Sequence, residues 1–293
     1  MQQPFYSSRL LASLFMLFSG ALFGWPAMAS PALENEPTVT LTGTLEWQMQ
    51  NEQGQPYRIL ISKPEGDVPY TGGYPVLYVL DANAYFPSFH AAKRAQKQYR
   101  HAIIVGIAYP GDEPLNFLRR AYDFSPSVPD DRNTPPQGGQ DELLDFLQHQ
   151  VMPAVAERFP VDAGQQSLFG HSFGGMFSIY ALFTRPALFD HIVAASPSLW
   201  WYDRYLLTPE RPFSEAVAQG KIDATHLSLA LIVGERDSPQ EIQDAQALQQ
   251  RLQPLSAWGM RSSVHIEPGE DHMAVPFKIE SRVLQEVLTT RRR

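Results

Sequence analysis

Runs of apolar residues divide the chain into an opening hairpin and a longer alternating region. Two β-rich segments, Thr38 to Trp47 and Tyr57 to Lys63, flank the turn-like Asn51-Glu52-Gln53-Gly54 and predict an antiparallel hairpin. Beyond it, short unbroken apolar or β-like runs predict strands that are mostly buried. These runs are Val76 to Leu80, Ala102 to Ile107, Ser167 to Phe169, Ile192 to Ala195, Leu227 to Val233 and Ser262 to Glu267.

Helical patterns lie between most of these runs. The predicted helices are Tyr85 to Gln98, Gln140 to Arg158, Gly174 to Thr184, Pro239 to Gln253 and Val275 to Thr289. Alternation of strands and helices after an antiparallel start predicts an α/β fold, with a mostly parallel sheet of about eight strands and helices on both faces. The Pro-rich stretch Ser125 to Gln140 either overhangs the functional site or is a solvated surface loop.

The N-terminus carries the pattern of a secretory signal peptide. Arg9 precedes the apolar run Leu10 to Trp25, and Ala27-Met28-Ala29 offers a cleavage site. A retained membrane anchor is the alternative, but the run is short for a bilayer span and contains glycine and serine. We therefore expect residues 1–29 to be removed and residues 30–293 to form a single catalytic domain in the periplasm.

The amino-acid composition excludes disulfides and argues against some classes of binding partner. The chain has no cysteine, so it forms no disulfide and has no lipidated Cys, and core packing must stabilise it. Its formal net charge of −8 argues against nucleic acid and anionic membranes as partners. We expect no nucleic-acid binding and no stable membrane association after signal cleavage.

A G-x-S-x-G motif supplies the first candidate chemistry. Gly170-His171-Ser172-Phe173-Gly174 stands between an apolar strand and a predicted helix, which is the context of a nucleophile elbow. Glycines allow the strained turn that presents the serine hydroxyl at a helix N-terminus. A glycine-rich turn with a capping serine is the non-catalytic alternative.

A serine nucleophile needs a base and an orienting acid. His272 follows a β-like segment and precedes the last helix, where α/β-hydrolases place their base. Asp237 follows the strand Leu227 to Val233 and completes the order nucleophile, acid, base. Glu235, Glu241 and, more weakly, Asp271 are alternative acids, and each also fits a solvated charge or a helix cap. The adjacent His171 is expected to point away from the serine.

Two backbone N–H groups are required for an oxyanion hole. Phe173 offers the first, and Ala82 or Asn83, in the loop after Val76 to Leu80, offers the second. An ordinary strand-to-helix turn capped by Asp81 or Asn83 fits the same loop equally well. No cofactor and no metal ion are expected for this chemistry.

Taken together, these residues resemble the esterase D-like branch of the α/β-hydrolases, especially periplasmic esterases of catecholate siderophores such as enterobactin. The resemblance spans nearly the whole mature chain. It rests on Tyr78-Val79-Leu80-Asp81-Ala82-Asn83, Val105-Gly106-Ile107-Ala108-Tyr109-Pro110, Arg119-Arg120-Ala121-Tyr122-Asp123-Phe124-Ser125-Pro126, the serine elbow, Ser196-Pro197-Ser198-Leu199-Trp200-Trp201 and Gly269-Glu270-Asp271-His272. One departure is that the family usually carries glycine where Ala82 stands.

The resemblance implies a ferric or iron-free trilactone of catechol-serine units as substrate, hydrolysed through an acyl-enzyme. Such an aromatic, anionic ligand suits indole and guanidinium groups, which Trp200, Trp201, Arg119 and Arg120 could supply. Alternatively, the tryptophans pack a core edge and the arginines pair with Asp123 or Glu113. Two other functions remain open: a broad carboxylesterase or acyltransferase on small acyl esters, and a non-catalytic periplasmic siderophore-binding protein.

Overall fold

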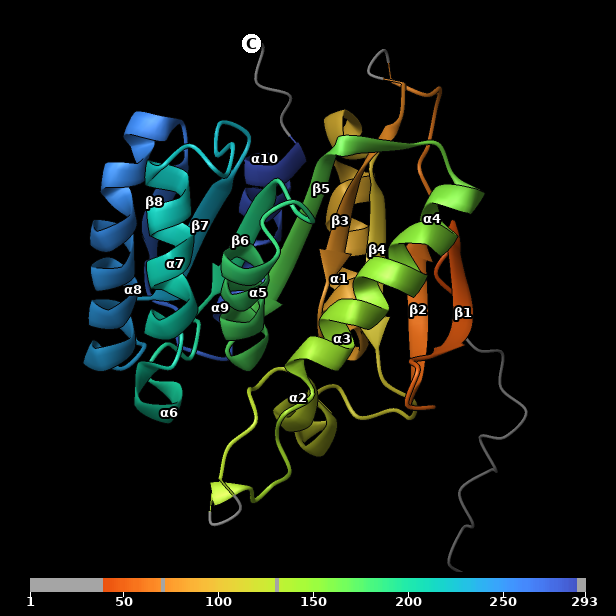
Figure 1. Ribbon diagram of the computed structural model, residues 1–293. Coiled ribbons are helices and arrows are strands. Elements are labelled where there is room, and N and C mark those ends of the chain that lie inside the picture. Colours follow the sequence, from red (N-terminus) through yellow and green to blue (C-terminus); the bar gives the residue numbers. More distant parts are fainter. Residues whose placement is uncertain (1–38, 70–71, 130–131, 289–293) are drawn as a thin grey trace, which may run out of the picture. The chain divides into compact units, whose positions relative to one another are not determined.

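One eight-stranded sheet with the order β1-β2-β4-β3-β5-β6-β7-β8 organises the computed structural model, which describes residues 39–69, 72–129 and 132–288 (Figure 1). The strands are β1 (Thr44–Gln50), β2 (Pro56–Ser62), β3 (Tyr74–Val79), β4 (Ile103–Ala108), β5 (Val161–His171), β6 (His191–Ala195), β7 (Ser228–Gly234) and β8 (Arg261–Glu267). β1 pairs antiparallel with β2 and β2 with β4, whereas all later pairs are parallel. The predicted α/β-hydrolase sheet with its N-terminal hairpin is therefore confirmed.

Helices cover both faces of this sheet. They are α1 (Ala82–Ala95), α2 (Phe117–Asp123), α3 (Gln140–Phe146), α4 (Met152–Arg158), α5 (Phe173–Thr184), α6 (Trp201–Arg204), α7 (Leu207–Ala218), α8 (Pro239–Leu252), α9 (Val275–Lys278) and α10 (Glu280–Leu288). The apolar residues of α1, α9 and α10 pack into one core cluster, and those of α3, α4, α5, α7 and α8 pack into another. Alternate residues of β3 account for the division, because Val76 and Tyr78 face one cluster while Leu77 and Val79 face the other.

The hairpin begins later than the sequence pattern predicts. β1 starts at Thr44 because Gly43 occupies a turn at φ +87° directly before it. β2 carries the inward-facing side chains Tyr57, Ile59 and Ile61, each fully buried. The described residues from Leu41 to Leu288 form one compact unit, whereas the predicted signal peptide, residues 1–29, lies outside the described residues.

Several helices differ from the predicted ones. The helix predicted from Gln140 to Arg158 is interrupted by a π-helical turn, η4 (Leu147–Val151), just before Pro153, a residue that has no N–H to donate. The last predicted helix is divided at Ile279 into α9 and α10. α2, α6 and α7 were not predicted, since two are very short and α7 contains prolines. Among the described residues, no helix has the length and apolarity that a bilayer crossing requires.

Candidate active site

Ser172 lies on a sharp bend between β5 and α5. Its backbone has φ 58° and ψ −115°, an unfavourable conformation for a residue with a side chain. The bend is fixed by the Ser172 N–H, which donates to the carbonyl of Ala195 (2.9 Å), and by the N–H of Ser198, which donates to the Ser172 carbonyl (3.1 Å). This strand-turn-helix geometry is that of a nucleophile elbow.

The glycines of the motif are not equivalent. A Cβ on Gly170 would lie 2.1 Å from the Gly174 carbonyl oxygen, whereas the nearest atom to a Cβ on Gly174 would be 3.4 Å away. Close approach of the helix to the strand therefore requires glycine at position 170 but not at position 174. Gly175 is intermediate, with three backbone atoms at 3.2 Å.

This difference predicts unequal effects on stability. Gly170→Ala is expected to lower the free energy of unfolding by about 3 kcal/mol or more, because backbone must move to accept the methyl group. Gly174→Ala is expected to change it by less than about 1 kcal/mol, since alanine suits a helix and meets only ordinary contacts. Urea denaturation of both variants measures the difference, and equal destabilisation would contradict the steric argument.

His272 approaches the serine from the loop after β8. Its Nε2 lies 3.1 Å from Ser172 Oγ, within proton-transfer reach. Ser198 Oγ lies 3.2 Å from the same hydroxyl and is almost fully buried. The structure thus brings together the serine and histidine that the sequence singled out, together with a second hydroxyl for which the sequence suggested no role.

Two carboxylates flank the other ring nitrogen of His272. Its Nδ1 is 3.7 Å from Asp237 Oδ1 and 3.4 Å from Glu241 Oε1. Asp237 is held from behind, since its Oδ2 accepts from Ser196 Oγ at 2.6 Å and from the Gly234 N–H at 3.0 Å. Glu241 closes a capping box with Ser238 at the start of α8.

The other candidate acids have different partners. Glu235 is exposed and accepts the Gly269 N–H at 2.7 Å, while Asp271 accepts the N–H groups of Met273 and Ala274. Asp237 and Glu241 are therefore the carboxylates that the structure brings to His272. The sequence favours Asp237 and leaves Glu241 as an alternative, and the structure places both near the same nitrogen.

The candidate oxyanion donors are the first amides of two helices. Phe173 opens α5, and Ala82 and Asn83 open α1, so their N–H groups have no carbonyl acceptor within the helix. The Ala82 methyl group is fully buried toward Gly106 of β4, where any added Cβ would lie only 2.7 Å away. Glycine at position 106 thus makes room for alanine at position 82. The side-chain amide of Asn83 donates to the carbonyl groups of Tyr109 and Gly111 and accepts the Tyr109 N–H.

Arg120 fixes these two helix starts to each other. Its guanidinium binds both oxygens of Asp81 at 3.1 Å and donates to the His171 carbonyl at 3.2 Å. Asp81, in a left-handed conformation at φ 50°, directly precedes α1, and His171 directly precedes the elbow. Arg120 therefore pairs with a carboxylate, as the alternative interpretation predicts, but its partner is Asp81 instead of Asp123 or Glu113. Arg120 is buried, and its guanidinium is paired within the protein.

Arg119 is likewise engaged within the protein. It lies 3.5 Å from Asp123 and stands over the ring of Tyr57 at 4.7 Å. Burial raises the pKa of Asp123 to about 6, although Arg119 acts in the opposite direction. The pairing with Asp123 is the alternative that the sequence left open, so this guanidinium is also occupied.

The tryptophans lie beside the elbow. Trp201 contacts the Phe173 ring at 4.8 Å, and its indole N–H donates to Gln137 of the Pro-rich loop at 3.2 Å. Trp200 packs edge-on against Trp201 and is 39% exposed. The Pro-rich segment thus contacts residues next to the serine, which favours the overhanging alternative, and Trp200 keeps an accessible face.

The ring of His171 lies next to the ring of His272, with 4.8 Å between the ring centroids. Tyr85 OH lies 2.8 Å from its Nδ1, and its Nε2 lies 2.8 Å from the His272 carbonyl oxygen. Burial, then the neighbouring His272 and Arg120, hold the pKa of His171 well below its usual range. A neutral ring with its proton on Nε2 satisfies both contacts, so His171 supports the backbone of His272 and points away from Ser172, as expected.

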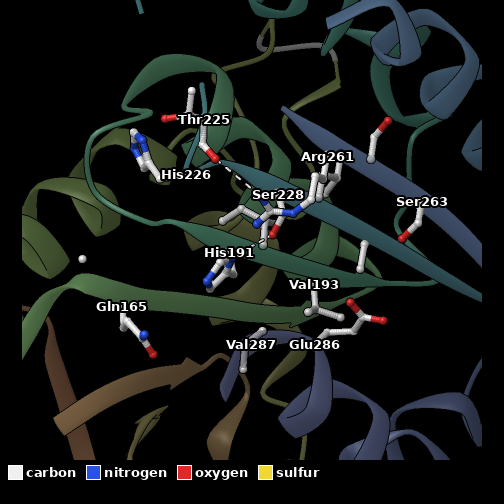
Figure 2. A pocket seen from close by; sticks show the side chains of 15 residues that line it. Gln165, His191, Val193, Thr225, His226, Ser228, Arg261, Ser263, Glu286 and Val287 are labelled. Atoms are coloured by element: carbon white, nitrogen blue, oxygen red, sulfur yellow. Dashed lines mark hydrogen bonds between the residues drawn. The ribbon is translucent and has the colours of Figure 1, made fainter. Parts of the chain in front are cut away.

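A second Ser–His contact lies at the opposite end of the parallel strands, where β6 and β7 begin. His191 Nδ1 is 2.8 Å from Ser228 Oγ, in a hollow of about 420 Å³ that Arg261, Gln165 and Glu286 also line (Figure 2). Ser228 begins the extended strand β7, so it has neither the strained turn nor the helix N-terminus of a nucleophile elbow. Ser172 therefore remains the candidate nucleophile.

The fold and this constellation are those of a serine hydrolase. Residues 50–275 match the sequence model of the family described as "Putative esterase", and the chain belongs to that family. It is 32% identical over 267 residues to ferri-bacillibactin esterase BesA of Bacillus subtilis, covering 85% of this chain and 91% of that protein. It is 35% identical over 213 residues to the siderophore enterobactin esterase of Emericella nidulans, covering 65% and 69%. The crystal structure of the BES protein from Bacillus cereus superposes with a TM-score of 0.79 at 31% identity, covering 86% of this chain and 97% of that one.

Proposed function

We propose that the chain is an exported serine esterase that hydrolyses the ester bonds of a catecholate siderophore, with Ser172 as nucleophile. The observation that carries the catalytic part is the 3.1 Å contact between Ser172 Oγ and His272 Nε2 at a strained elbow. The names of its relatives, which include esterases of bacillibactin and enterobactin, support the substrate class. The sequence pattern of residues 1–29 supports export to the periplasm.

In the first half-reaction, Ser172 Oγ attacks the ester carbonyl carbon while its proton passes to His272 Nε2. The oxyanion is stabilised by the N–H of Phe173 and by that of Ala82 or Asn83. Collapse of this intermediate breaks the ester C–O bond, and the imidazolium returns the proton to the leaving alcohol. Water then attacks the acyl-enzyme with the same base, which frees the acid and restores Ser172.

Charge on the imidazolium needs a counterpart on the Nδ1 side. Asp237, with a fully buried side chain, and Glu241, 14% exposed, both face that nitrogen. Their distances of 3.7 and 3.4 Å exceed a normal N–H···O hydrogen bond. We therefore assign them a shared role, in which Asp237 is the main acid and Glu241 adds a second negative charge.

A shared role predicts a non-additive pair of substitutions. Asp237→Asn and Glu241→Gln, made singly, are expected to lower kcat by about 10-fold to 10²-fold, with the larger loss in Asp237→Asn, because one carboxylate remains in both. The double variant is expected to lose about 10³-fold. Steady-state kinetics on a chromogenic ester measures the effects, and Glu235→Gln is the matched control that should retain activity. A larger loss in the control than in Asp237→Asn would contradict the assignment.

Aromatic and cationic groups near the elbow support a catecholate substrate. Trp200 is 39% exposed, and Arg132, whose side chain is 59% exposed, stands 5.5 Å from the ring centroid of Tyr202. Arg119 and Arg120 pair with buried carboxylates, whereas Arg132 pairs with the exposed Asp203 at 3.6 Å. We therefore propose Arg132 as the guanidinium that an anionic ligand can reach, in exchange for this surface ion pair.

The substrate is tested by comparing ferric and iron-free enterobactin with a short-chain acyl ester and separating the products chromatographically. We expect linear and shorter catechol-serine products, with kcat/KM at least about 10²-fold higher than for the simple ester. Preference for the simple ester would instead identify a broad carboxylesterase or acyltransferase. Binding without any product would identify a non-catalytic siderophore-binding protein.

A further inference from the structure

Three potential ligand atoms converge on the side of His272 that faces away from Ser172. Asp237 Oδ1, Glu241 Oε1 and His272 Nδ1 all lie within 4.8 Å of one another. Asp237 Oδ1 and His272 Nδ1 are both buried atoms without a hydrogen-bond partner among the described residues. The cluster therefore places a fully buried carboxylate oxygen beside a ring nitrogen, and neither atom has a hydrogen bond within the described residues.

The two distances to His272 Nδ1 exceed those of direct hydrogen bonds and are compatible with a small divalent cation between the ligands. Zinc bonds of about 2.0–2.2 Å to nitrogen and oxygen place two ligands of a tetrahedral site about 3.4 Å apart. Nδ1 lies 3.4 Å from Glu241 Oε1 and 3.7 Å from Asp237 Oδ1. Two carboxylates around a neutral imidazole also supply the negative charge that a divalent ion requires.

Each carboxylate is oriented by its second oxygen, as metal ligands commonly are. Asp237 Oδ2 accepts from Ser196 Oγ and the Gly234 N–H. Glu241 Oε2 accepts from the Ser238 N–H at 3.1 Å and from Ser238 Oγ at 2.8 Å. These contacts leave Asp237 Oδ1 and Glu241 Oε1 facing Nδ1.

We propose that Asp237, Glu241 and His272 form an inhibitory Zn²⁺ site. Coordination occupies the Nδ1 lone pair, and the ring proton then resides on Nε2. In that tautomer Nε2 donates to Ser172 Oγ and cannot accept its proton, so the nucleophile is not activated. The ion regulates the enzyme and takes no part in hydrolysis. This inference rests on the proposed role of His272 as base.

The test combines direct binding with activity. Isothermal titration calorimetry with Zn²⁺ is expected to show one ion per chain, and chromogenic ester hydrolysis should fall in parallel with occupancy and recover with EDTA. Glu241→Gln, which keeps a capping-box side chain, should weaken Zn²⁺ binding by about 10-fold or more. Glu235→Gln, at an exposed carboxylate on the preceding loop, should leave the Kd for Zn²⁺ within about 2-fold of the original.

Two results would overturn the inference, and they are separable from failure of the proposed function. The first is absence of one-site Zn²⁺ binding, or binding that Glu241→Gln leaves unchanged; calorimetry detects either even in a protein without esterase activity. The second is full occupancy with undiminished hydrolysis, which would show that the ion does not block the base. Loss of ester hydrolysis before any zinc is added would count against the proposed function alone.

Discussion

Replacing Ser172 with alanine is expected to lower kcat for ester hydrolysis by about 10⁴-fold or more. The Oγ atom that forms the acyl-enzyme is removed, while the helix-start N–H groups and the binding surface remain. Ligand affinity and the free energy of unfolding should change little, because alanine keeps the Cβ and removes only the contacts to His272 and Ser198. Kinetics on a chromogenic ester, with urea denaturation of the same sample, measures both quantities.

Ser228→Ala is the matched control for this substitution. Ser228 contacts His191 at 2.8 Å, closer than Ser172 contacts His272, but lies at the opposite end of the parallel strands. We expect this variant to keep kcat within about 2-fold of the original. Activity that survives Ser172→Ala but falls in Ser228→Ala would place the chemistry at Ser228 and His191 and contradict the assignment.

His272→Ala is expected to lower kcat by about 10⁴-fold with little change in KM. Without the imidazole, no base lies next to Ser172 Oγ, and Ser198, the other hydroxyl in contact, cannot act as one. The ground-state binding surface is untouched, which is why the loss should appear in kcat. Steady-state kinetics over a range of ester concentrations separates the two parameters.

His171 provides the comparison for this prediction. Its buried ring supports the His272 carbonyl and faces away from the serine. His171→Gln retains an N–H donor for that carbonyl and is expected to cost about 10-fold or less, whereas His171→Leu removes the donor and should cost more. A greater loss in His171→Gln than in His272→Ala would exchange the roles of the two histidines.

The sheet could be predicted from the sequence because its central strands are buried on both faces. Short unbroken apolar runs such as Val76 to Leu80 and Leu227 to Val233 are typical of such strands. The short helix α2 could not be predicted, since seven residues beginning at the exposed Phe117 and Leu118 leave no helical periodicity to detect. The break at Ile279 also lacks a local signal, because no proline or glycine marks it.

The candidate nucleophile and base were accessible to sequence reasoning because their positions follow from chain order around the sheet. The contacts that other helices and strands make around these two residues could not be predicted in this way. Arg120 binds Asp81, 39 residues earlier in the chain, and so fixes two helix starts that only the folded sheet brings together. Glu241 approaches His272 because α8 begins beside the end of β8. The Ser196-Pro197-Ser198 segment after β6 was part of the family resemblance, but the sequence did not indicate that Ser196 contacts Asp237 or that Ser198 contacts Ser172. Such pairings depend on side-chain direction across several strands, which periodicity does not encode.

Covalent chemistry at Ser172 is the step on which the proposed function depends most directly. Rapid acid quenching of the protein during turnover of a slowly hydrolysed acyl ester, followed by peptide mass spectrometry, detects an acyl group where it forms. We predict acylation of the peptide that contains Ser172, absent from Ser172→Ala and formed far more slowly in His272→Ala, because attack by Ser172 Oγ needs the same base. Acylation of a different serine, or turnover by Ser172→Ala at the original rate, would contradict the proposed mechanism.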